Sequence, residues 1–274
     1  MICKSVGQMN IDILTLFPKM FDGFLTESLI KRAIKNKIIS INFWDLRKFA
    51  TDKHQTVDDR PYGGGPGMVL RVDVIDKALL KVKRQKAKGK RKKKKEKRKI
   101  ILLTPQGKVF NQKMAEKLSK FDHLILVCGH YEGFDERIRK LVDMEISIGD
   151  YVLTGGEIPA QVIIDSAVRL IPGVIGKKES LKQESFGNWE LSRFFPKNFS
   201  KGNRDSDIKS RKIGNLLEYP QYTKPEIYTP QSIQGKKEMR VPKILLSGNH
   251  QKINQWRYEQ ALKRTKKRRP DLLK

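Results

Sequence analysis

The chain has 274 residues, 38% of them apolar, which predicts a folded protein with one large core and a smaller second one. It has no run of about 20 apolar residues and no signal-peptide core, so we expect a soluble, cytoplasmic protein. Two cysteines, and four histidines without ligand spacing, argue against a disulfide framework and a structural metal. The net charge of +28 is typical of a protein that binds nucleic acid.

Much of this charge lies in residues 81–99, where fourteen of nineteen side chains are Lys or Arg. Like charges packed so densely repel one another, so the run predicts a solvated insertion loop. A solubilising or localising role and a role in RNA affinity are equally compatible with it. The rest of the chain still carries +15, and nucleic acid remains the expected partner.

From residue 9 the sequence alternates short apolar runs with amphipathic segments, which predicts an α/β fold. Continuous apolar runs bounded by Gly or Pro suit buried parallel strands. The expected strands are residues 11–17, 38–43, 100–105, 124–129 and 146–149. The expected helical segments are residues 18–35, 72–80, 111–120, 134–141 and 157–170. Loops at the strand ends should form the functional site.

Three parts are expected along the chain. Residues 9–175 carry the α/β pattern, with the basic run as an insertion. Residues 176–215 are rich in Lys, Ser, Asn and Gly with little apolar periodicity, which indicates a linker with an insertion. Residues 216–274 regain order and end in a basic helix, which predicts a small, mainly helical C-terminal domain.

Three glycine-rich segments stand out: PYGGGPGM at 61–68, CGHYEG at 128–133 and SIGDYVLTGGE at 147–157. Glycine permits close backbone approach and positive φ, so such loops can press main-chain amides against a flat ligand. Neither a P-loop nor a dinucleotide fingerprint is present. The plain alternative is that each segment is a tight turn and that Glu132 merely caps a helix.

Taken in order, these segments resemble the bacterial tRNA (guanine-N1)-methyltransferases. Further motifs of the resemblance are TPQG at 104–107, DER at 135–137, RLIPGV at 169–174, YPQYTKPE at 219–226 and LLSGNH at 245–250. It covers nearly the whole chain from residue 9, apart from the basic run and residues 198–215. It implies a knotted α/β domain, in which three strand-end loops form a trefoil around bent S-adenosylmethionine.

The resemblance also assigns the cofactor pocket. Glycine and apolar residues dominate it, which suits an adenine held by main-chain hydrogen bonds and a cationic sulfonium near an aromatic ring or a carboxylate. The assigned residues are Leu103, Thr104, Pro105, Gln106, Gly129, Tyr131, Glu132, Ser147, Ile148, Gly149, Tyr151, Leu153, Gly155, Gly156 and Pro159.

Methylation at guanine N1 requires a base, because N1 carries a proton, and negative charge then develops on O6. The resemblance assigns the O6 role to Arg169. The family's base is an aspartate after the knot, and the alignment puts Glu184 there, with Glu179 as second candidate. Family members are homodimers, so Glu184 would act in the partner's site. Each residue also has a non-catalytic interpretation. Glu184 would be a solvated surface carboxylate, and Arg169 would be a cation that complements the dipole at the C-terminal end of a helix.

Contacts to RNA are implied as well. The loop at 61–68 would help hold a flipped guanine, and basic C-terminal residues would grip the anticodon stem. The assigned residues are Tyr62, Gly63, Gly64, Gly65, Pro66, Gly67, Met68, Arg257, Lys263 and Arg264.

The sequence departs from the family's pattern at two positions, and two other functions compete with the methylation of guanine N1. His130 stands where many members have arginine, and Glu184 stands where they have aspartate. The family's behaviour implies that Mg²⁺ assists, although the sequence shows no dedicated site. The competing functions are a different knotted RNA methyltransferase and a non-catalytic RNA-binding relative.

Overall fold

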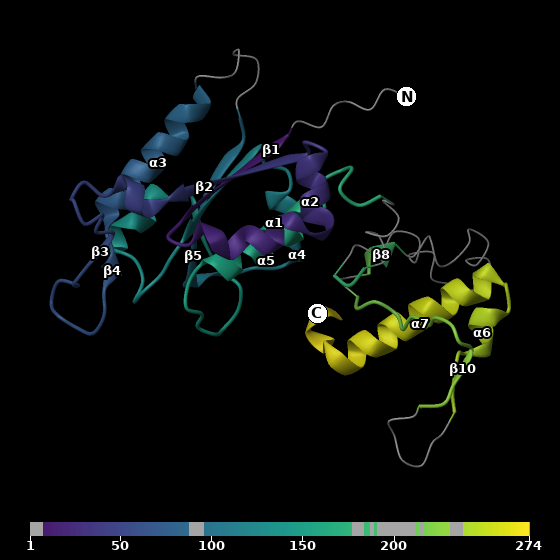
Figure 1. Cartoon of the computed structure of the whole chain (residues 1–274). Helices are drawn as coiled ribbons and strands as arrows, with labels where there is room; N and C mark the ends of the chain where they lie inside the picture. Colours follow the sequence, from purple (N-terminus) through teal and green to yellow (C-terminus); the bar gives the residue numbers. More distant parts are fainter. Residues whose placement is uncertain are drawn as a thin grey trace. The chain divides into compact units, whose positions relative to one another are not determined.

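The computed structural model describes residues 8–87, 96–176, 184–186, 189–190, 212–213, 216–230 and 238–273. The chain divides into two compact units, Met1–Gly176 and Lys177–Lys274, each with its own packing (Figure 1). Within the described ranges, no helix is both long enough and apolar enough to cross a bilayer.

Unit 1 is built on a five-stranded sheet in the order β2-β1-β6-β5-β7. Every neighbouring pair in it is parallel, as the buried apolar runs predicted. The strands are β1 (Met9–Thr15), β2 (Ile39–Asp45), β5 (Arg98–Val109), β6 (His123–Cys128) and β7 (Met144–Ser147). All six residues of β6 are buried, in keeping with its central place in the order.

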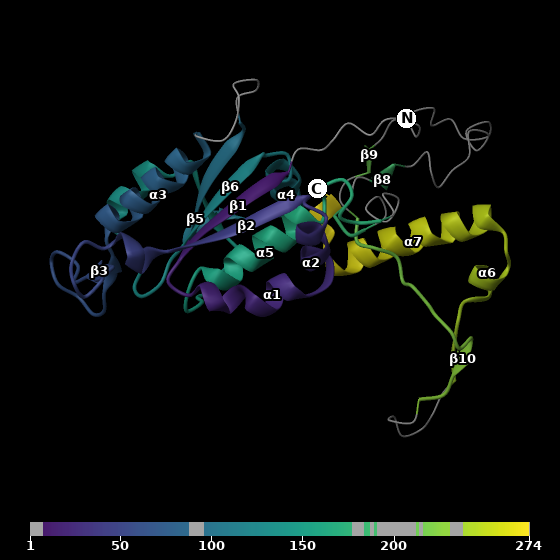
Figure 2. The same cartoon turned by 45° about the horizontal axis from the view of Figure 1, so that its top comes forward.

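Helices cover both faces of the sheet (Figure 2). One apolar cluster joins α2 and α5 to residues of β1 and β6 that point to their side, such as Ile11 and Leu124. The other joins α3 to residues of the opposite face, such as Leu14 and Ile125. The helices of unit 1 are α1 (Asp22–Thr26), α2 (Ser28–Lys35), α3 (Val72–Ala87), α4 (Gln112–Leu118) and α5 (Glu157–Val168). Each sheet face is thus buried separately.

Two helical segments differ from their predicted form. Residues 18–35 do not make one helix: 3₁₀ helix η1 (Pro18–Phe21) leads into α1, and an extended Glu27 (φ −128°, ψ 162°) separates α1 from α2. The segment at 134–141 forms 3₁₀ helix η3 (Glu136–Leu141) instead of an α-helix. Asp135 begins η3 by accepting the amide of Arg137 at 2.9 Å, so Glu132 is not its cap.

The prediction of a solvated loop over all of residues 81–99 is wrong at both ends. Helix α3 continues to Ala87, because buried Val82 extends the apolar stripe of Val74, Ala78 and Leu79. At the other end, Arg98 and Lys99 already pair with β6. Helix and strand pairing therefore order the flanks despite their charge. Residues 88–95 lie outside the described part.

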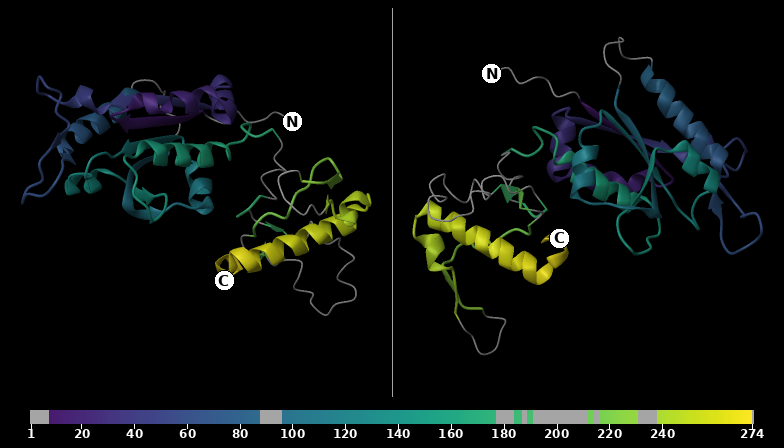
Figure 3. Two further views of the ribbon diagram at one scale, coloured as in Figure 1. Left: turned by 60° about the horizontal axis from the view of Figure 1, so that its bottom comes forward. Right: turned by 180° about the vertical axis from the view of Figure 1, so that it is seen from behind.

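Unit 2 contains α6 (Lys243–Leu246), the long helix α7 (His250–Arg268, yellow in Figure 3) and η8 (Pro270–Leu273). Leu216 and Ala261 form its buried centre, with Tyr219, Tyr258 and Leu262 packed around them. Asn249 caps α7 by accepting the amide of Lys252 at 3.1 Å. Short ladders complete the unit: β8 (Trp189–Glu190) with β9 (Lys212–Ile213), and β10 (Ile227–Tyr228) with β11 (Met239–Arg240).

Candidate active site

A pocket of about 330 Å³ lies in unit 1, beside the second half of β5 and the carboxyl ends of β6 and β7. Its lining residues come from three segments, within residues 103–106, 129–139 and 146–159. All fifteen residues assigned to the cofactor from the sequence lie on its wall. The edge of a parallel sheet therefore brings together three segments that are far apart in the chain, at the position where α/β proteins bind ligands.

The first segment is a bulge inside β5. Leu103 and Lys108 both align with Ile146 of β7, so the four residues between them loop out of the ladder. Gly107 closes this bulge, because a Cβ there would lie 2.5 Å from the backbone nitrogen of Ile146. The bulge turns residues 104–106 toward the pocket, and only glycine fits at its closure.

The second and third segments meet through glycines. The amide of Gly156 donates to the carbonyl of Gly129 at 2.8 Å, and His130 forms a bridge with Gly155. A Cβ on Gly156 would lie 2.7 Å from the Cα of Cys128, inside β6. The wall at this point is therefore bare backbone, which a flat ligand can approach closely.

The rim of the pocket contains a residue in a left-handed backbone conformation. Tyr131 has φ 61°, which is uncommon outside glycine and is retained where the surroundings hold it. The amide of the next residue, Glu132, donates to the carbonyl of Met68 at 3.1 Å. A Cβ on Gly67 would overlap the Cγ of Glu132. The glycine-rich loop at 61–68 therefore lies against the Tyr131–Glu132 turn, with Tyr62 fully exposed.

Behind the Gly155 wall lies a buried polar group that sequence reasoning missed. Glu157 is 1% exposed, and its Oε1 accepts the hydroxyl of Thr15 at 2.6 Å. Its Oε2 and the Nδ1 of His130 have no hydrogen-bond partner among the described residues, and both lie within 3 Å of the point where a Gly155 Cβ would be. Burial, together with the charge of Glu157, raises the pKa of the Cys128 thiol well above its ordinary value.

Arg139 of η3, another lining residue of the pocket, bridges several groups. It donates to Gln106 and pairs with Glu145 and with Glu136, the last at 2.8 Å. Glu136 and Arg139 line the pocket, but neither was assigned to it from the sequence, although Glu136 stands in the DER motif. Their three-residue spacing after β6 was the available signal, since it puts both on one face of a helical turn.

Comparison with known proteins gives the family. A sequence model described as tRNA (Guanine-1)-methyltransferase TrmD matches residues 9–274. A Dictyoglomus turgidum protein named tRNA (guanine-N(1)-)-methyltransferase is 47% identical over 265 residues, 97% of this chain and 90% of its own. Proteins of the same name from Endomicrobium trichonymphae and Lactiplantibacillus plantarum are 44% and 48% identical, over 97% of this chain and 100% and 91% of theirs. The chain belongs to this family.

Of the two residues expected to be catalytic in this member of the TrmD family, Arg169 belongs to unit 1 and does not line its pocket. Helix α5 starts beside the pocket at Glu157, whereas Arg169 is its C-terminal cap, about 18 Å further along the helix axis. Glu184 belongs to unit 2 and is half-buried. Glu179 lies outside the described residues.

The expected RNA contacts on α7 are partly used inside unit 2. The Arg257 guanidinium lies 4.9 Å from the centre of the Tyr219 ring, and Arg264 donates to the carbonyl of Glu218 at 3.1 Å. Lys263 is exposed. Arg257 and Arg264 therefore position the 216–219 segment against α7, and Lys263 is the freest of the three to meet phosphate.

Proposed function

We propose that this protein transfers a methyl group to N1 of the guanine immediately 3′ of the anticodon in tRNA, with S-adenosylmethionine as donor. The observation that supports this most strongly is family membership over nearly the entire chain. The same match over 97% of the chain does not favour a non-catalytic RNA-binding relative or another kind of RNA methyltransferase. The function is tested directly by the appearance of 1-methylguanosine in tRNA.

The pocket residues fit the proposed donor. Gly129, Gly155 and Gly156 carry no side chain, so a flat adenine can approach the main chain closely at this part of the wall. Leu153 and Pro159 supply apolar walls, and the half-exposed rings of Tyr131 and Tyr151 suit a neighbouring cation. When bound there, S-adenosylmethionine supplies an electrophilic methyl group.

The protein's own residues would activate the guanine. The Glu184 carboxylate would accept the N1 proton, so that the N1 lone pair becomes available for the methyl group. The Arg169 guanidinium would donate to O6, where negative charge develops, and a charge-assisted bond there is stronger in the transition state. The rim loop at 61–68, against Glu132, would hold the flipped base.

Two finer features accompany this proposal. We propose that the three pocket segments form the family's trefoil knot and that the protein is a homodimer with a composite site. The place of Arg169, at the end of α5 remote from its own pocket, supports a site that needs a second subunit.

We further propose that methyl transfer depends on Mg²⁺ without a resident ion. Among the described residues, no three His, Cys, Asp or Glu side chains gather to hold a metal.

The pocket assignment is tested by titrating S-adenosylmethionine into Leu153→Arg. Arginine would put an unpaired charge into an apolar wall, so we expect affinity to fall by about a hundred-fold or more. Leu246→Arg, at a similarly exposed leucine of unit 2, is the matched control and should stay within about two-fold. Equal affinity of both variants would remove the cofactor from this pocket.

The composite site is tested by mixing two inactive variants, Leu153→Arg and Glu184→Gln. If Glu184 serves the partner's pocket, each mixed dimer has one intact site, and an equal mixture recovers about a quarter of full activity. If Glu184 serves its own pocket, every site carries one lesion and no activity returns. Arg169→Ala mixed with Leu153→Arg tests the arginine in the same way.

A further inference from the structure

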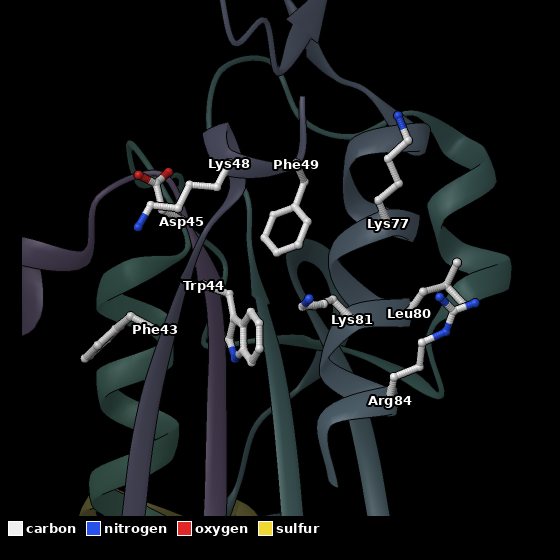
Figure 4. Close-up of a pocket in the computed structure, with 9 residues that line it drawn as sticks. All are labelled: Phe43, Trp44, Asp45, Lys48, Phe49, Lys77, Leu80, Lys81 and Arg84. Carbon is white, nitrogen blue, oxygen red and sulfur yellow. The ribbon is translucent and has the colours of Figure 1, made fainter. Parts of the chain in front are cut away.

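A second hollow of about 640 Å³ lies in unit 1, between the end of β2 with 3₁₀ helix η2 (Leu46–Phe49) on one side and α3 on the other. It shares no lining residue with the candidate active site. Figure 4 shows Lys77, Leu80, Lys81 and Arg84 along the α3 side, and Phe49 and Trp44 between the helix and the sheet. We call this hollow the α3 groove.

The α3 groove is strongly basic. Lys77, Lys81 and Arg84 follow one another at helical spacing on one face of α3, and Lys48 is contributed by η2. Asp45 is the one acidic residue of the lining, and it already accepts the Arg47 amide at 3.0 Å. Lys77 lies 3.5 Å from Asp73, but no carboxylate of the described residues pairs with the other three cations.

The floor of the α3 groove is aromatic. The Trp44 and Phe49 rings lie 6.3 Å apart at 40°, and both are half-buried. The indole nitrogen of Trp44 donates inward to Asp12 at 3.1 Å, so its polar edge is satisfied within the core. Aromatic rings below a row of cations are the arrangement that binds an unpaired nucleotide, with a base on the rings and phosphates on the cations.

The geometry of the α3 groove suggests a role in RNA binding for the first residues of the basic run. Lys81 and Arg84, which open the run, belong to ordered α3 and line the α3 groove. The first basic side chains of the 81–99 run therefore line the α3 groove. A purely solubilising charge would not need the part-exposed Trp44, Phe49 and Leu80 beside it.

We propose that the α3 groove is an RNA-binding site that holds the tRNA backbone, with an unpaired base against Trp44 and Phe49, outside the methyl-transfer pocket. The identity of the RNA rests on the proposed function. Binding there would raise tRNA affinity without contributing to the chemical step, because the groove and the active-site pocket share no lining residue.

The first test is the triple variant Lys48→Gln, Lys81→Gln, Arg84→Gln, measured with a tRNA transcript over a range of salt concentrations. We expect the dissociation constant to rise about ten-fold or more and the slope of log K against log salt to become shallower by about two. The matched control replaces the exposed Lys31, Arg32 and Lys35 of α2 with glutamine. Its dissociation constant and its salt slope should both change less than those of the triple variant. Affinity for S-adenosylmethionine and the kcat at saturating tRNA should stay unchanged.

The second variant, Phe49→Leu, removes a ring and keeps an apolar side chain. It should weaken binding about five-fold while leaving the salt slope unchanged, because stacking involves no phosphate. A triple variant that behaves like its control would overturn the proposal, and a silent Phe49→Leu would overturn the stacked base. If the unaltered protein transfers no methyl group to tRNA, the proposed function is refuted instead. The measured RNA affinities would still test the α3 groove.

Discussion

The hydroxyl of Thr15 and the carboxylate of Glu157 are joined by a 2.6 Å hydrogen bond although 142 residues separate them in the chain. Both side chains are fully buried, and the Thr15 oxygen also accepts the Phe17 amide at 2.9 Å. The bond ties the end of β1 to the first turn of α5, directly behind the Gly155 wall of the pocket. A carboxylate at a helix N-terminus is also favoured by the helix dipole.

Thr15→Val should lower the free energy of unfolding by about 2 to 3 kcal/mol, because it leaves a buried carboxylate with one donor fewer. Urea denaturation measures this. Thr26→Val is the matched control: the Thr26 hydroxyl bonds only within exposed α1, so the loss there should stay under about 1 kcal/mol. Equal losses at both positions would mean that the Thr15–Glu157 bond adds nothing.

Gly156→Ala should abolish measurable S-adenosylmethionine binding and destabilise unit 1. The new Cβ would lie 2.7 Å from the Cα of Cys128 and 2.8 Å from the amide nitrogen of Gly129, so two backbone segments would have to separate. Gly23→Ala is the control, since nothing lies within 4 Å of its added methyl and it sits in helix α1. The control should be neutral or stabilising by up to about 1 kcal/mol. Calorimetric titration and thermal unfolding measure the two effects.

Gly67→Ala should lower kcat/KM for tRNA by about ten-fold or more through displacement of Glu132 at the pocket rim. Gly64→Ala isolates that effect. Both glycines have a similar positive φ, 76° and 79°, and therefore the same backbone strain, but only the Gly67 methyl would meet another side chain. Equal losses in steady-state kinetics would assign the defect to loop strain and not to Glu132.

The pH dependence of the free energy of unfolding should show the raised pKa of the Cys128 thiol. Its folded pKa lies well above the unfolded value because the thiol is buried beside Glu157. The folded state therefore keeps a proton that the unfolded chain releases, so the contribution is complete below the unfolded pKa and is lost as pH rises above it. Between about pH 8 and pH 10, stability should fall more steeply in the unaltered protein than in Cys128→Ala. Parallel pH curves would contradict this.

The strands and the pocket segments could be predicted because they depend on short-range signals. Apolar runs such as 124–129 gave the buried strands, and the glycines at 129, 155 and 156 marked places where backbones meet. All three lie on the pocket wall. The end of α3 was missed because charge density outweighed the continuing apolar stripe at Val82 in the prediction.

What the sequence could not give are relationships set by long-range packing. Nothing local pairs Thr15 with Glu157, and nothing in the TPQG motif shows that it bulges out of β5 against β7. The distance of Arg169 from its own pocket follows only from where α5 starts and in which direction it runs. The α3 groove likewise could not be predicted from local sequence, because its lining comes from β2, η2 and α3, which only the fold brings together.

The central claim is tested most directly by two tRNA transcripts that differ only in having guanosine or adenosine immediately 3′ of the anticodon. Each is incubated with purified protein and S-adenosylmethionine, digested to nucleosides and analysed by mass spectrometry. The account predicts 1-methylguanosine from the guanosine transcript alone, and its loss in Leu153→Arg. Methylation at a ribose or at another base, or no methylation of tRNA that is nevertheless tightly bound, would contradict it.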